Sequence, residues 1–123
     1  MIRIAAVGDV HVDADVVGRY RPALEELPGV ADVLLIAGDL TRHGTVAEAG
    51  SFATEFGGLE VPVVVVLGNH DHQSDQADEV ASGMTATFSG ATFRCLSTCC
   101  RVASETAMMR AARRALSGSS ARW

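Results

Sequence analysis

The stretch VPVVVVLGNHD at residues 61–71 decides the fold class of this chain. It begins with an apolar run at 61–67 that is rich in Val and short enough to form one buried strand. Gly68 ends the run, and Asn69, His70 and Asp71 follow as a polar cluster. The stretch therefore predicts a strand that leads directly into polar residues at its carboxyl end.

Two earlier segments repeat this arrangement. Apolar runs at 2–7 and 33–37 lead into glycine followed by metal-binding residue types, in Gly8-Asp9-Val10-His11 and in Gly38-Asp39. The runs are continuous rather than alternating, which is typical of parallel strands covered on both faces. Asp9 precedes Asp39 by 30 residues, and Asp39 precedes Asn69 by another 30, which is about one strand-helix unit each.

The segments between the runs predict helices. Pro22 suits the first helical position of a short helix that Pro28-Gly29 ends. Thr45 and Glu48 have the spacing of a capping box, which begins a second helix that ends at a double glycine. A weaker third helix is predicted at about 75–84. This alternation predicts a single α/β domain with a parallel β-α-β-α-β core and right-handed crossovers.

The polar residues after the strands predict a metal site. The carboxyl ends of neighbouring parallel strands line one crevice, so these side chains should converge. Asp9 and His11 lie two apart in an extended segment and project to the same side. Asp39 has two oxygens and could bridge two ions, while Asn69 offers a neutral amide oxygen. Mixed imidazole, carboxylate and amide ligands favour Mn, Fe or Zn over Ca.

In this order and spacing, the three motifs resemble those of the calcineurin-like metallophosphoesterases. The resemblance covers residues 1–84 and implies part of a metallophosphoesterase-type sandwich. It implies two divalent ions, with Asp9 and His11 on the first, Asp39 bridging both, and Asn69 on the second. It also implies that His70 is the catalytic general acid, which protonates the leaving alkoxide. The implied activity is hydrolysis of a phosphomonoester or phosphodiester by a hydroxide that the two ions activate.

Simpler interpretations compete with these assignments. Asp9 and Asp39 could be turn or cap residues, which are common after strands. His70 could support a ligand rather than act itself. His43 and His72 match no ligand position of the family and are interpreted as solvated loop residues. The remaining acidic residues near the motifs are interpreted as loop, cap or supporting groups: Asp13, Asp15 and Asp71.

Residues 85–123 differ from the rest of the chain. Residues 1–84 hold four Arg against 14 Asp and Glu, whereas 85–123 hold six Arg against one Glu. All three cysteines lie in this later segment: Cys95, Cys99 and Cys100. We expect an irregular tail, with a poor strand within 86–96 and a weak helix at 103–116. We hypothesise that the tail is frame-shifted or disordered; a cysteine metal or redox site is less favoured, because no second Cys pair accompanies it.

The family also has later metal-binding histidines, on a further strand and in a Gly-His-x-His motif. No histidine follows His72 in this sequence. The alternative to an active phosphoesterase is therefore a catalytically impaired, truncated fragment or pseudoenzyme of that family, with residual metal binding.

Partners and location follow from charge and hydropathy. The expected partner is a small-molecule phosphoester, and the acidic body argues against a specific nucleic acid; binding through the Arg-rich tail ranks last. No leader and no apolar run long enough for a bilayer are apparent, so we expect a cytoplasmic protein without a membrane partner. A truncated sheet would leave an uncovered edge, through which self-association is predicted.

Overall fold

The structure, a computed structural model, describes residues 1–87 and 93–96, with side chains up to residue 84. Its sheet has four parallel strands in chain order: β1 (Ile4–Gly8), β2 (Val33–Ala37), β3 (Val63–Val66) and β4 (Phe93–Leu96). The three predicted strands are confirmed, and the α/β class with them.

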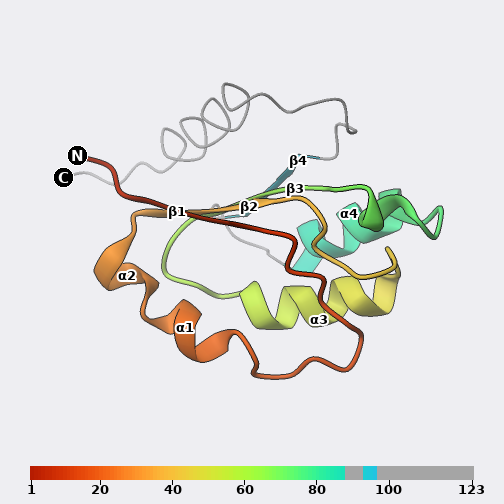
Figure 1. The fold of residues 1–123 in the computed structure, drawn as a ribbon, viewed down its shortest axis with the longest axis horizontal. Coiled ribbons are helices and arrows are strands. Elements are labelled where there is room, and N and C mark those ends of the chain that lie inside the picture. Colours follow the sequence, from red (N-terminus) through yellow and green to blue (C-terminus); the bar gives the residue numbers. More distant parts are fainter. Residues whose placement is uncertain (88–92, 97–123) are drawn as a thin grey trace.

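The helices lie together on one side of the sheet (Figure 1). Strands that are neighbours in sequence are neighbours in the sheet, so right-handed crossovers place every connecting helix on the same side. These elements are α1 (Arg21–Glu25), α2 (Leu27–Val30), α3 (Val46–Phe56), the 3₁₀ turn η1 (His70–His72) and α4 (Ala77–Thr87). Within the described ranges, no helix has the length and apolar character needed to cross a membrane.

The predicted helix boundaries are confirmed in part. A capping box at Thr45 and Glu48 begins α3, and Gly57 follows its last residue. The prediction that Pro28-Gly29 ends the first helix is wrong in detail, because α1 already ends at Glu25. Pro28 instead lies at the start of α2, where a residue without an N–H is tolerated.

The core lies between the sheet and α3. Side chains of β2 and β3 that face the helices are buried together with both phenylalanines of α3, which stack with ring centroids 4.5 Å apart: Leu34, Ile36, Val63, Val65, Phe52 and Phe56. Burial of each large apolar side chain contributes roughly 1.5–3 kcal/mol. This core holds the carboxyl ends of β2 and β3, and hence the loops that follow them, in fixed positions.

The prediction that all three strands are covered on both faces is wrong for β1. Ile4 is 41% exposed and Val7 is 40% exposed, whereas the four residues of β3 are all buried. The reason is position: in the described sheet β1 pairs only with β2 and forms an edge. The hydrophobic pattern of a segment predicts that it forms a strand, but it does not predict whether that strand lies at the centre or at the edge of the sheet.

Regular structure continues past residue 84, where we expected the tail to begin. Helix α4 extends to Thr87, and β4 pairs in parallel with β3, within the segment 86–96 that predicted a poor strand. Pairing with β3 favours a strand here beyond what local composition indicates. Cys95 lies on β4. The predicted helix at 103–116, Cys99 and Cys100 lie outside the described residues.

Candidate metal centre

The loops after β1 and β2 run side by side and continue the parallel ladder beyond the strands. The His11 N–H donates to the Asp39 carbonyl at 2.9 Å, the Val12 N–H donates to the Leu40 carbonyl at 2.9 Å, and Val12 bridges to Thr41. Val12 and Thr41 are fully buried. The backbone of His11 is thereby fixed against the backbone of Asp39, and their side chains start from adjacent positions.

Three predicted site residues have left-handed backbone conformations. Asp9, His11 and Asp39 have φ of 54°, 44° and 49°. A positive φ is uncommon outside glycine, although Asp and His tolerate it better than most residues. Such strained positions persist only where surrounding contacts hold them, and they concentrate at functional sites.

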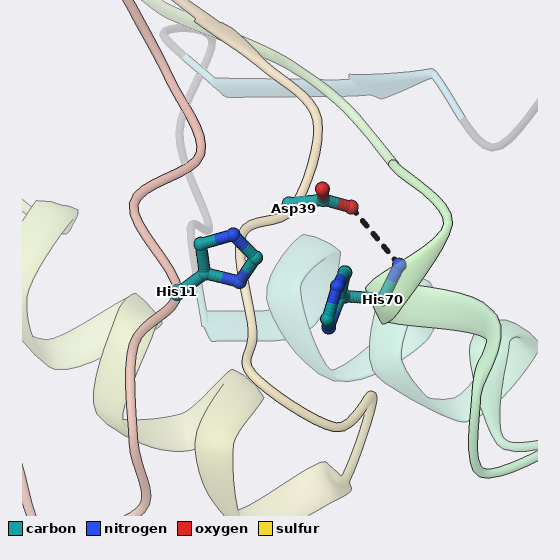
Figure 2. Close-up of side chains that lie close together, drawn as sticks. All are labelled: His11, Asp39 and His70. Atoms are coloured by element: carbon teal, nitrogen blue, oxygen red, sulfur yellow. Dashed lines mark hydrogen bonds between the residues drawn. The ribbon is translucent and has the colours of Figure 1, made fainter.

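His11, Asp39 and His70 come together at this edge of the sheet (Figure 2). One donor atom from each lies within 4.8 Å of the others, in a group that could hold a metal ion. Asp39 is buried, and the two histidines are half-buried. The three residues come from the loops after β1, β2 and β3, as the strand-end argument predicted.

His70 is held by three contacts. Its backbone N–H donates to Asp39 Oδ1 at 2.9 Å, and its ring Nδ1 lies 2.8 Å from the Arg42 carbonyl oxygen. Its ring also meets the His11 ring edge to face, with centroids 4.6 Å apart. The ring is therefore fixed on both sides, toward the loop after β2 and toward the loop after β1.

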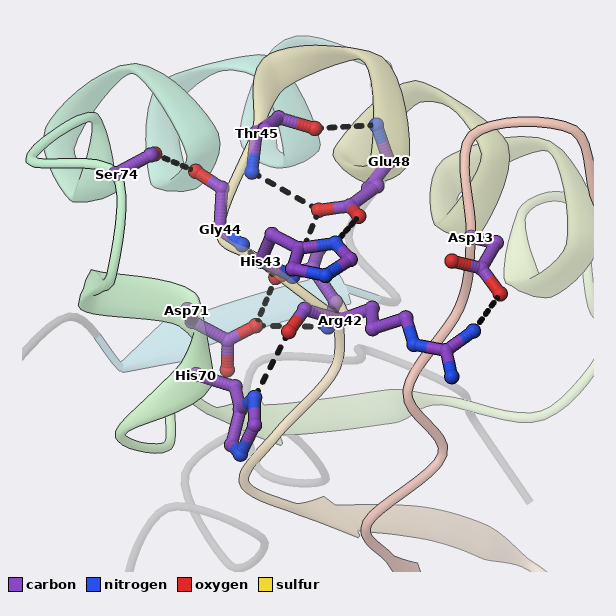
Figure 3. Close-up of polar contacts among 10 residues, drawn as sticks. Asp13, Arg42, His43, Gly44, Thr45, Glu48, His70, Asp71 and Ser74 are labelled. Atoms are coloured by element: carbon purple, nitrogen blue, oxygen red, sulfur yellow. Dashed lines mark hydrogen bonds and ion pairs between the residues drawn. The ribbon is translucent and has the colours of Figure 1, made fainter.

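Asp71 ties the loop after β3 to the loop after β2 (Figure 3). Its carboxylate is fully buried and accepts four hydrogen bonds. One oxygen accepts the N–H groups of Leu40 and Gly68 at 3.1 and 2.8 Å; the other accepts the N–H and hydroxyl of Thr41 at 2.8 and 2.5 Å. The predicted supporting role of Asp71 thus has a physical basis: it locks together the loops that carry Asp39 and His70.

Two glycines allow these loops to approach closely. A Cβ on Gly68 would lie 2.2 Å from both the backbone N and Oδ1 of Asp39. A Cβ on Gly44, whose φ is +75°, would lie 2.7 Å from the Asp71 carbonyl oxygen and 2.8 Å from that of His70. Neither approach is compatible with a side chain at these positions.

Asp9 and Asn69 occupy less enclosed positions. Both are exposed, and the Asp9 carboxylate is not among the donor atoms that lie within 4.8 Å of one another. Asn69 directly precedes η1, where its carbonyl accepts from the His72 N–H at 3.3 Å. The loops carry both residues to the same edge of the sheet, but the closest grouping is made by His11, Asp39 and His70.

A second group of potential ligands lies nearby, and its members already pair with other side chains. Arg42 pairs with Asp13 at 2.7 Å, and the His43 ring lies 2.8 Å from Glu48 (Figure 3). Burial alone would raise the pKa of the Glu48 carboxyl, but hydrogen bonds from Thr45 and His43 outweigh burial and lower this pKa. His43, although 62% exposed, is thus a partner of Glu48 rather than a freely solvated residue.

The solvated interpretation is also incomplete for His72. Its side chain is half-buried, and its Nε2 is buried without a hydrogen-bond partner among the described residues. Sequence alone could not indicate this, because burial of a loop residue depends on which segments pack over it.

The donor set fits a divalent transition metal. Two imidazoles and one carboxylate suit Mn, Fe or Zn, and they leave coordination positions open for water or substrate. The contact of His70 Nδ1 with a carbonyl is the type of outer contact that orients metal-binding histidines.

Comparison with known proteins identifies a family for this chain. A family model for calcineurin-like phosphoesterases matches residues 2–114, which include all three motifs and extend beyond residue 84. Comparisons with curated proteins and with solved structures give no significant match. Since the family model covers most of the 123 residues, the chain belongs to the calcineurin-like phosphoesterase family.

Proposed function

We propose that this protein hydrolyses a phosphoester with a divalent metal ion held at His11 and Asp39. The supporting observation is the convergence of imidazole and carboxylate donors at the carboxyl ends of β1, β2 and β3 in a member of this family. A bound divalent ion supplies Lewis acidity, which lowers the pKa of an attacking water and offsets charge on the phosphate oxygens.

The residues of the chain contribute by arranging the donors in advance. The backbone ladder fixes His11 against Asp39, and the hydrogen bond from the His70 N–H holds one Asp39 oxygen in place. The second Asp39 oxygen accepts no hydrogen bond from the described residues that would compete with a cation. Donors held in this way need little reorganisation when charge develops in the transition state.

The electrostatics favour a small phosphomonoester or phosphodiester over a nucleic acid. Of the four arginines in residues 1–84, Arg3, Arg21 and Arg42 already form ion pairs with Asp32, Glu25 and Asp13. Little unpaired positive charge is therefore left in residues 1–84 to bind the phosphates of a nucleic-acid backbone.

The family roles of Asp9 and Asn69 as ligands, and the presence of a second ion, remain predictions from the resemblance.

Turnover of chromogenic esters tests the proposal. We expect the purified chain to hydrolyse p-nitrophenyl phosphate or bis-p-nitrophenyl phosphate when Mn²⁺ is added. Asp39→Asn should abolish this turnover, while Asp13→Asn, which removes a carboxylate outside the group, should retain it. A folded, metal-loaded protein without turnover would instead support the alternative, a catalytically impaired family member.

A further inference from the structure

We propose that Tyr20 is a positioning residue for the candidate metal centre, because its hydroxyl group fixes the backbone between Asp9 and His11. The inference rests on the proposed function, in which the loop after β1 carries metal ligands. The motifs of the sequence do not indicate Tyr20, which lies outside all three of them and nine residues beyond His11. Its role follows from contacts that bring its side chain back to the start of the loop.

The first contact is made with the backbone of the loop itself. The Tyr20 hydroxyl donates to the Val10 carbonyl oxygen at 3.0 Å. Val10 lies between Asp9 and His11, which have left-handed φ values of 54° and 44°. Such conformations persist only where surrounding contacts hold them. The N–H groups of Asp9 and His11 donate to carbonyls of the loop after β2 at 3.3 and 2.9 Å, and the Tyr20 hydroxyl holds the carbonyl between them.

Tyr20 is itself held against the C-terminal end of α3. Its N–H donates to Glu55 Oε2 at 2.8 Å, and the Gly18 N–H donates to Glu55 Oε1. The Glu55 side chain is buried, so these hydrogen bonds replace the water that a buried carboxylate would otherwise lose. The Tyr20 ring packs against the Phe56 ring, with centroids 5.5 Å apart. Both the backbone and the ring of Tyr20 are therefore fixed, which gives its hydroxyl a defined position.

Helix α3 thereby joins the two loops that carry the candidate ligands. At its N-terminal end, Glu48 accepts the N–H groups of His43 and Thr45, each at 3.0 Å, which holds the segment after β2. At its C-terminal end, Glu55 holds the segment after β1 through the contacts of Tyr20. A shift of one loop relative to the other would have to break contacts at one end of this helix.

Tyr20→Phe tests the inference, because it removes the hydroxyl and keeps the ring that packs on Phe56. Nuclear magnetic resonance relaxation of the metal-free chain measures the order of the loop in the folded state. The backbone order parameters of Val10 and His11 should be about 0.85 in the parent, as in rigid backbone, and should fall to about 0.6 in Tyr20→Phe. A residue that only stabilised the fold would lower the unfolding midpoint and leave these order parameters unchanged.

Calorimetric titration with Mn²⁺ measures the consequence for the site. Tyr20→Phe should weaken binding by about threefold to tenfold, less than the 10–100-fold typical for loss of a group bonded directly to a ligand. Thr54→Val is the matched control, because it also removes a hydroxyl that donates to a backbone carbonyl, here that of Gly50 at 2.9 Å on the exposed side of α3. This control should keep the order parameters and the Mn²⁺ affinity of the parent.

Either of two results would overturn the role of Tyr20: equal order parameters in the parent and Tyr20→Phe, or equal Mn²⁺ affinities of the two chains. Both results leave the proposed function intact where the parent binds Mn²⁺ and turns over phosphoesters. A parent chain that binds no Mn²⁺, but whose loop loses order in Tyr20→Phe, would remove the proposed function and keep the role of Tyr20 in fixing the loop.

Discussion

At the scale of single residues, Asp71 is the side chain near the site whose replacement we expect to destabilise the fold most. Its buried carboxylate accepts hydrogen bonds from Leu40, Thr41 and Gly68. Asp71→Asn keeps the shape but turns an NH₂ group toward backbone N–H donors, which leaves buried donors unsatisfied. We expect a loss of about 2–4 kcal/mol in the free energy of unfolding, measured by urea denaturation, together with weaker Mn²⁺ binding.

Asp75→Asn is the matched control for Asp71→Asn. Asp75 is exposed, and its φ of 56° is one that Asn tolerates as well as Asp. The control makes the same change of charge four residues away and should stay within about 0.5 kcal/mol of the parent. Equal losses in the two variants would show that net charge, rather than the buried network, determines the effect.

Position 68 must also be glycine, because the loop after β3 passes close to Asp39 there. Any Cβ there would collide with Asp39, so Gly68→Ala should displace the Asp39 carboxylate. We expect destabilisation of about 1–3 kcal/mol and loss of high-affinity Mn²⁺ binding, both followed by thermal unfolding with and without the ion. Gly50→Ala, at a helical position with open space around it, should instead stabilise the protein by about 0.5–1 kcal/mol. Retention of Mn²⁺ affinity in Gly68→Ala would contradict the close approach of the two loops.

The sequence could predict part of the site but not its closest contacts. The spacing of His11, Asp39 and His70 after three apolar runs sufficed to bring them to one edge, because parallel strands end together. The Arg42 carbonyl opposite His70 and the four donors around Asp71 depend on how two loops fold against each other. Contacts between two loops produce no recurring pattern of residue types, so the sequence alone does not predict them.

At the scale of elements, the N-terminus of α3 carries a pH dependence. Glu48 accepts hydrogen bonds from the backbone of Thr45 and from His43, and its pKa in the folded chain is lowered from its ordinary value of 4.5. The ionised carboxylate is thus favoured by folding. Its contribution to stability is present above pH 4.5 and is lost as the pH falls through the lower pKa of the folded state.

Glu48→Gln isolates this charge, because Gln can still complete a capping box. At pH 7 the parent should be more stable than the variant, and the difference should narrow as the pH falls below 4.5. Guanidinium unfolding at a series of pH values measures this difference, with Glu60→Gln, at an exposed position, as the control. A difference that stays constant or widens toward low pH would reverse the sign and refute the argument.

Elements were predictable where local chemistry defines them. The apolar runs identified β2 and β3, and the capping box identified α3, because both signals lie within a few residues. The exposure of β1 and the pairing of β4 were not predictable in the same way. Both depend on the order of strands in the sheet, which follows from packing over the whole chain.

At the scale of the molecule, the free edge of β1 is the feature that bears on association. In the described sheet β1 pairs with β2 alone, and it exposes Ile2, Ile4 and Val7. The nearby Arg3 is drawn into an ion pair with Asp32 and a hydrogen bond to the Gly29 carbonyl. The edge therefore lacks the free charge, proline or bulge by which edge strands commonly resist pairing.

We expect two copies of the chain to associate through β1, as an edge strand pairs with its symmetry mate. Ile4→Lys places a charge on this edge and should shift the protein toward monomer, because a charge on an edge strand disfavours pairing with another strand. Sedimentation velocity over a concentration series measures the shift. Val17→Lys, on a loop residue that is 84% exposed, adds the same charge elsewhere and should leave the association unchanged. A parent chain that stays monomeric at all concentrations, or an equal effect of both substitutions, would show that this edge does not mediate association.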